Sequence, residues 1–196
     1  YLAKTKDLSF ENMKRGVIYG SALASFCVEK FGPQRLKELT AKEIEDFTVK
    51  IAEDCKKHDL VLMLEPLSYS LDENKNLSSD EKRYVVVETA KRLTPLNVDI
   101  LKAEFPLDKD EADESKWMDA CKEISSASVV PWILLSAAVE YDLFLRQVTV
   151  ACNAGASGIA VGRAVWKEAV TMSVDERMKF LRTTAKYRIS RLTSLC

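Results

Sequence analysis

Three ionisable side chains in two short segments of the sequence could act together on a carbonyl compound. The segment VDILKAEFP (residues 98–106) resembles a buried strand, yet Lys102 and Glu104 interrupt its apolar residues. Side chains alternate along a strand, so Lys102 and Glu104 lie on one face, together with Ile100. Burial in an apolar pocket disfavours a charged ammonium group, and a neutral lysine amine attacks a carbonyl carbon to form a Schiff base.

Glu65 is placed to move the protons that such chemistry needs. It ends the apolar segment LVLMLEP (residues 60–66), which is predicted to be the preceding strand. If the two strands are neighbours, Glu65 comes close to Lys102 and can shuttle protons during carbinolamine dehydration and carbon–carbon cleavage. The alternative is that Lys102 and Glu104 form a buried structural ion pair, since buried charges are costly without a partner.

Small and polar residues follow two later strand-like segments. Ser136 comes after VPWILL, and Gly162 and Arg163 come after GIAV. A bare backbone amide at Gly162 beside the guanidinium of Arg163 would suit an anionic end of a substrate, as in barrels whose last loops hold a phosphate. The alternative is that Arg163 is a surface arginine after a tight turn.

The elements that must position these residues alternate between apolar strands and amphipathic helices. This alternation, with a spacing of roughly thirty residues, predicts an α/β fold whose parallel sheet is covered by helices. An open doubly wound sheet and a (β/α) barrel both remain open, and no GxGxxG motif indicates a dinucleotide-binding fold. The predicted strands are residues 60–66, 98–106, 130–137 and 158–164; the predicted helices are 79–93, 115–124, 141–153 and one that starts at 173.

The first fifty or so residues are predicted to be helical. FENMKRGVIYGSALASFCVEKFG (residues 10–32) is followed by a second helical stretch that ends near His58. Thr40 is the expected N-cap of the second helix, and Glu43 completes a capping box.

Composition excludes several classes of protein. The chain has 196 residues and a net charge of -1 with acids and bases interspersed, which gives no support for nucleic-acid or membrane partners. No apolar stretch is long enough to cross a bilayer. The five scattered cysteines contain no CxxC pair, so no disulfide framework is expected and a reducing cytoplasm fits. His58 is the single histidine, which excludes sites needing two imidazoles, and we expect it at a solvated helix end.

Four segments together resemble the class I aldolases of the tagatose-1,6-bisphosphate aldolase type and the similar sulfofructose-phosphate aldolases. The segments are LEPLSY, VDILKAEFPL, PWILLSAAV and AGASGIAVGRAVWKEAV, in that order, and the resemblance covers about residues 49–170. It implies the last four βα units of a (β/α)8 TIM barrel, since the segments that carry the first four strands in this family have no match here.

The resemblance also implies an activity. A phosphorylated ketose would be cleaved reversibly to dihydroxyacetone phosphate and an aldehyde, without a metal or organic cofactor. By matching positions, Lys102 is the Schiff-base lysine and Glu65 the acid/base. Ser136, Gly162 and Arg163 are contacts to the substrate anion, and Glu104 is placed with the substrate-binding residues.

The N-terminal segment resembles a different family. Residues 1–46 are similar to the C-terminal tail of a ribokinase-like (PfkB-type) sugar kinase, without the signature that holds the kinase's catalytic aspartate. We therefore expect a helical segment over residues 1–48 and a partial aldolase barrel over 49–196. A catalytically inactive fragment and a sugar-kinase-related protein remain the alternatives. The expected partner is a small sugar phosphate, with no nucleic acid or membrane, and a homo-oligomer is possible.

Overall fold

The computed structural model describes residues 6–7, 9–14, 39–70, 72 and 74–196. The chain divides into two compact units, Tyr1–Leu60 and Val61–Cys196. Most of the predicted helix over residues 10–32 lies outside the described residues. Among the described residues, no helix is long and apolar enough to cross a membrane.

The first unit contains the long helix α4 (Ala41–Lys57). The predicted capping box is confirmed: the Glu43 amide donates to Thr40 Oγ1 at 3.2 Å, and the Thr40 amide donates to Glu43 Oε2 at 2.8 Å. His58 is the C-cap and its side chain is exposed, as expected for a solvated helix end.

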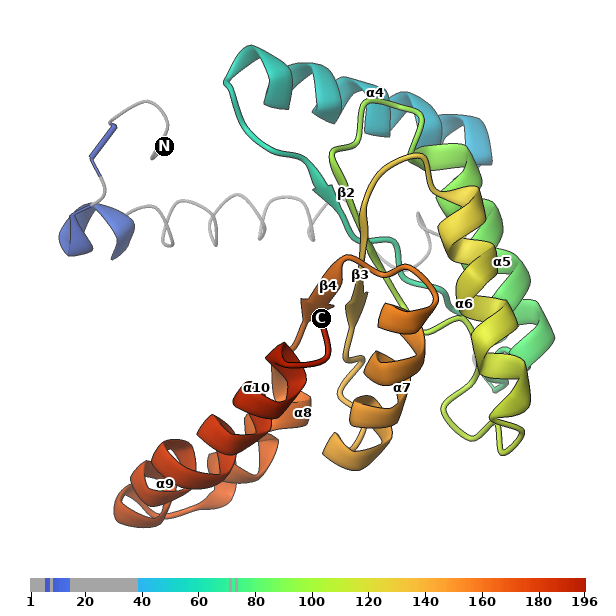
Figure 1. Cartoon of the computed structure of the whole chain (residues 1–196). Helices are drawn as coiled ribbons and strands as arrows, with labels where there is room; N and C mark the ends of the chain where they lie inside the picture. The colour runs from blue at the N-terminus through green and yellow to red at the C-terminus, as the bar shows by residue number, and fades with distance from the viewer. Residues whose placement is uncertain (1–5, 8, 15–38, 71, 73) are drawn as a thin grey trace. The chain divides into compact units, whose positions relative to one another are not determined.

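The second unit is built on a four-stranded parallel sheet in which neighbouring strands follow the chain, in the order β1-β2-β3-β4. Helices connect successive strands, and Figure 1 shows them following one another beside the sheet. The strands are β1 (Met63–Leu64), β2 (Ile100–Ala103), β3 (Trp132–Leu135) and β4 (Gly158–Ala160); the connecting helices are α5 (Ser79–Leu93), α6 (Ser115–Ala127) and α7 (Tyr141–Asn153).

This order decides between the two architectures that the sequence leaves open. A doubly wound sheet reverses its strand order at a switch point, whereas sequential strands joined by right-handed crossovers place all helices on one face. The sheet has no reversal, and α5, α6 and α7 all contribute to one hydrophobic core. The second unit is therefore part of a (β/α) barrel.

The strands are shorter than predicted because neighbouring strands are hydrogen-bonded to each other over only a few residues. The predicted strand over residues 60–66 is reduced to two residues, since β1 pairs with β2 only through Met63↔Ile100 and Leu64↔Leu101. The side-chain alternation is confirmed on β2. Leu101 and Ala103 are buried in the core, while Ile100 and Lys102 are half-buried on the other face.

A three-way contact holds the turn between α7 and β4. Trp132 Nε1 donates to Ser125 Oγ at 2.9 Å, and Ser125 Oγ donates to the Ala154 carbonyl at 2.6 Å. Gly155 follows with φ of +109°, a conformation that glycine adopts without strain. Gly155 therefore lets the chain turn away directly after α7.

The chain ends in a helical arm, defined here as residues 163–196. The predicted helix from Ser173 is present but changes its winding in the middle. Arg188 joins two parts of the arm to each other: its Nη1 donates to the Val165 carbonyl at 2.9 Å and its Nη2 pairs with Glu168 at 2.8 Å. The elements of the arm are α8 (Arg163–Trp166), the 3-10 helix η1 (Lys167–Thr171), α9 (Val174–Phe180), the π-helix η2 (Leu181–Ala185) and α10 (Lys186–Thr193).

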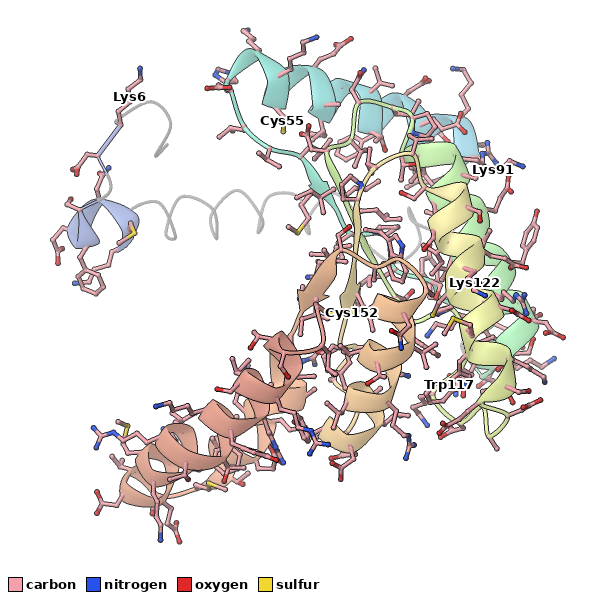
Figure 2. All side chains as sticks on the ribbon, in the orientation of Figure 1. Lys6, Cys55, Lys91, Trp117, Lys122 and Cys152 are labelled. Atoms are coloured by element: carbon pink, nitrogen blue, oxygen red, sulfur yellow. A yellow bond between two sulfur atoms is a disulfide. The ribbon has the colours of Figure 1, made fainter. Side chains whose placement is uncertain are left out.

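One expectation about the cysteines is corrected. Cys152, labelled near the end of α7 in Figure 2, forms a disulfide with Cys196 at the end of the arm. The scattered positions of the cysteines gave no sign of this bond, because folding brings together two residues that are 44 apart in sequence. A single bond is present among the described residues, and Cys55 and Cys121 are free.

Candidate active site

Lys102 and Glu65 form an ion pair at the carboxyl ends of two adjacent strands. Lys102 Nζ donates to Glu65 Oε2 at 2.8 Å, although the residues are 37 apart in sequence. The lysine side chain is 23% exposed and the glutamate side chain 41%, so solvent and small molecules reach the pair. The predicted proximity of the two groups is confirmed, and it follows from the parallel pairing of β1 with β2.

Glu104 has other partners than Lys102. Its Oε2 accepts hydrogen bonds from the Ser68 amide and the Ser68 hydroxyl, both at 2.6 Å. Its Oε1 lies 3.8 Å from Lys82 Nζ, which comes from α5. The alternative of a buried ion pair between Lys102 and Glu104 is therefore wrong, since each pairs with a different residue.

A tight turn follows β3 and carries Ser136 into the same region. Ser136 is buried, and its carbonyl accepts a hydrogen bond of 3.1 Å from the Val139 amide. Between them, Ala137 and Ala138 have φ values of 45° and 58°. Left-handed backbone at two successive alanines costs energy, and such strain tends to collect at functional sites.

Gly162 and Arg163 stand at the next strand end, where β4 leads into the helical arm. Gly162 is half-buried and Arg163 is exposed. Added bulk at Gly162 would approach Trp166 Nε1 at 3.7 Å, an ordinary contact, so the structure does not require glycine here for lack of space.

All six predicted site residues line one cleft, with a volume of about 700 Å³. Apolar side chains complete its wall, including Leu67, Leu135 and Val161. The cleft lies at the carboxyl ends of the strands, where barrels of this type keep their active sites. The predicted residues are Glu65, Lys102, Glu104, Ser136, Gly162 and Arg163.

Three residues that contribute to this region were not predicted from the sequence. Ser68 and Trp166 line the cleft, and Lys82 reaches Glu104 from α5. The position of Ser68, three residues after Glu65, was a usable signal. Lys82 gave none, because on a helical pattern it is one of several basic residues beside acidic ones.

Chemically, the cleft offers a lysine amine that donates a hydrogen bond of 2.8 Å to a carboxyl group, with further polar groups at the neighbouring strand ends. Among the described residues, no group of three His, Cys, Asp or Glu side chains is arranged to hold a metal ion.

Residues 34–168 match the pattern of the DeoC/LacD family aldolases, so the chain belongs to this family. A tagatose 1,6-diphosphate aldolase of Staphylococcus haemolyticus is 26% identical over 208 residues, covering 86% of this chain and 64% of the relative. One from Streptococcus agalactiae is 28% identical over 178 residues, covering 79% and 54%. The chain thus spans about half to two thirds of these relatives.

Solved structures agree on the fold. The crystal structure of an archaeal fructose 1,6-bisphosphate aldolase is 25% identical with a TM-score of 0.50, covering 74% of this chain and 52% of that one. A Corynebacterium glutamicum protein, 16% identical with a TM-score of 0.51, supports the fold alone. The sheet corresponds to part of a TIM barrel, as predicted. The resemblance of residues 1–46 to a sugar-kinase tail stays a prediction.

Proposed function

We propose that this chain is a class I aldolase module that cleaves a phosphorylated ketose through a Schiff base on Lys102. The observation that carries the proposal is the 2.8 Å contact between Lys102 Nζ and the Glu65 carboxylate, inside a cleft at the carboxyl ends of a partial barrel. Membership of the aldolase family supports it.

In the proposed mechanism, the ion pair supplies both the nucleophile and the acid. Transfer of one proton from Lys102 to Glu65 leaves a neutral amine and a carboxylic acid. The amine adds to the ketone carbon, and Glu65 returns the proton to the departing hydroxyl, which leaves as water. A base then removes the proton of the hydroxyl on the β carbon, and the bond between the α and β carbons breaks. Its electron pair moves toward the iminium and forms an enamine, while the β carbon leaves as an aldehyde.

The remaining steps restore the enzyme. The enamine left on Lys102 takes a proton on carbon, and water hydrolyses the resulting iminium. For a ketose of the tagatose-1,6-bisphosphate or sulfofructose-phosphate type, the product released would be dihydroxyacetone phosphate. The curated relatives, which are tagatose 1,6-diphosphate aldolases, support the first substrate class.

Ser136, Gly162 and Arg163 are proposed as contacts to the substrate anion. A buried hydroxyl, a backbone amide and an exposed guanidinium line the side of the cleft formed by the ends of β3 and β4. Guanidinium groups bind phosphate and sulfonate oxygens through charge-assisted hydrogen bonds. We place the catalytic part of the chain in residues 49–196, in the cytoplasm, and the mechanism needs no metal or organic cofactor.

Borohydride trapping tests the proposal. The protein is incubated with dihydroxyacetone phosphate, reduced, digested and analysed by mass spectrometry, with Lys102→Met as the control. We expect the reduced adduct on Lys102 and none in the variant. Glu65→Gln should slow retro-aldol turnover by about 10²- to 10⁴-fold. Adduct on another lysine, or no adduct in folded protein, would contradict the proposal.

A further inference from the structure

Glu104 is a buried carboxylate whose two oxygens are both engaged. The residue is 8% exposed, and Ser68 donates two hydrogen bonds of 2.6 Å to Oε2. The other oxygen faces Lys82 Nζ at 3.8 Å, and the Lys82 side chain is itself only 16% exposed. A carboxylate with these partners has little capacity left for a substrate, although it lines the cleft.

Ser68 belongs to a segment without helix or strand among its described residues, between β1 and α5. The segment starts at Glu65, so the position of the Glu65 carboxylate depends on how the segment is held. Only Pro66 and Leu67 separate Glu65 from Ser68, and the proline ring fixes the φ angle of Pro66, which restricts how far the two residues can move relative to each other. Hydrogen bonds to an ionised carboxylate are about twice as strong as neutral ones. Glu104 therefore anchors the segment close to Glu65.

We infer that Glu104 is a positioning residue that sets the Glu65 carboxylate against Lys102 by holding Ser68, with Lys82 offsetting the cost of the buried charge. The inference rests on the proposed function, and it replaces direct substrate contact as the role of Glu104. Lys102 lies in β2 and Glu104 directly follows it, so one strand and its first loop residue present the amine and anchor its acid/base partner.

Turnover of single and double variants tests this coupling. Glu104→Gln keeps the size of the side chain but removes its charge, and we expect kcat to fall about 10- to 100-fold with KM within about 2-fold, as a misplaced catalytic group predicts. In a Glu65→Gln background the same change should cost less than about 2-fold, because the group it positions is already disabled. Equal losses in both backgrounds would overturn the inference.

Two variants control the experiment. Glu123→Gln removes a carboxylate that pairs with Arg83 on the surface, with Nη2 to Oε1 at 2.7 Å, and it should leave kcat unchanged. Ser68→Ala loses the hydroxyl donor but keeps the amide donor, so it should reduce kcat less than Glu104→Gln does. If Glu104→Gln fails to fold, Ser68→Ala in both Glu65 backgrounds decides the same question.

Two readouts do not require turnover. Hydrogen exchange of the Ser68 amide should accelerate at least 10-fold in Glu104→Gln, while exchange in α7 stays unchanged. Acetylation of Lys102 should accelerate several-fold in Glu104→Gln, to the rate of Glu65→Gln, without further gain in the double variant. Unchanged exchange and acetylation would overturn the inference. If borohydride trapping fails while both rates respond, the proposed function is wrong but the anchoring stands.

Discussion

Replacing Gly155 with alanine should destabilise the second unit, because the site is closed in two ways. An added Cβ would lie 2.9 Å from Ser125 Oγ, closer than side chains tolerate. The φ of +109° is unfavourable for any residue with a Cβ. Ser125 cannot move away freely, since its hydroxyl joins Trp132 Nε1 to the Ala154 carbonyl.

The size of the effect follows from these two contributions. Left-handed backbone costs an L-residue about 1–2 kcal/mol. Displacing the Ser125 hydroxyl sacrifices one or two hydrogen bonds at about 1 kcal/mol each. We therefore expect Gly155→Ala to lower the free energy of unfolding by about 2–4 kcal/mol, which corresponds to a fall of roughly 1–2 M in the urea midpoint.

Tryptophan fluorescence during urea unfolding measures this change. All three tryptophans lie in the second unit, so the signal reports on that unit. Ser125→Ala removes the obstructing hydroxyl, and in that background the cost of Gly155→Ala should fall to the backbone contribution alone, about 1–2 kcal/mol. An unchanged midpoint for Gly155→Ala would refute the reasoning, and equal costs in both backgrounds would refute the clash.

Three further predictions concern the strained turn, the arm and the thiols. Ala138→Gly should raise the free energy of unfolding by about 0.5 kcal/mol, since relief of left-handed strain exceeds the entropy cost of glycine; a lower urea midpoint would contradict this. Arg188→Met should lower it by about 2 kcal/mol at pH 7, because a charged hydrogen bond to a backbone carbonyl is lost. Arg188 also lowers the pKa of Glu168 by donating a hydrogen bond, so this ion pair stabilises the fold at neutral pH. The contribution of this ion pair is lost as the pH falls from 4.5, the ordinary value, through the lowered pKa of Glu168. The difference in the free energy of unfolding between wild type and Arg188→Met should therefore shrink in acid. A difference that stays constant with pH would contradict the assignment. Burial raises the pKa of the Cys121 thiol to about 12. At pH 8, iodoacetamide should therefore label Cys55 first and Cys121 only on unfolding. Equal labelling rates for the two cysteines, measured by mass spectrometry, would show Cys121 to be accessible.

Helix positions could be predicted wherever local chemistry sets them. Helices α5 and α7 have the bounds predicted from the sequence, residues 79–93 and 141–153. For α5 the reason is a capping box, in which Ser78 and Glu81 satisfy each other's backbone amides. For α7 the reason is the glycine that ends it. Strand lengths were less predictable, because they depend on how far a neighbouring strand continues.

The approach of Lys102 to Glu65 was also predictable, since alternation fixes the face of each side chain and parallel strands bring their carboxyl ends together. The partners of Glu104 were not. A strand pattern shows which face a residue occupies, but not which helix or loop residue arrives beside it, and both Ser68 and Lys82 arrive from outside the sheet. The disulfide was hidden for the same reason.

The sequential strand order has a consequence for how this molecule can change over time. The amine and the carboxyl group are supplied by consecutive βα units, and the 36 residues between Glu65 and Lys102 include α5. Connections at the amino ends of the strands can therefore lengthen, shorten or drift while the reacting pair keeps its spacing. Residues that carry the chemistry and residues in the distant connections therefore lie at opposite ends of the same units. Substitutions at one end can accumulate without disturbing the other.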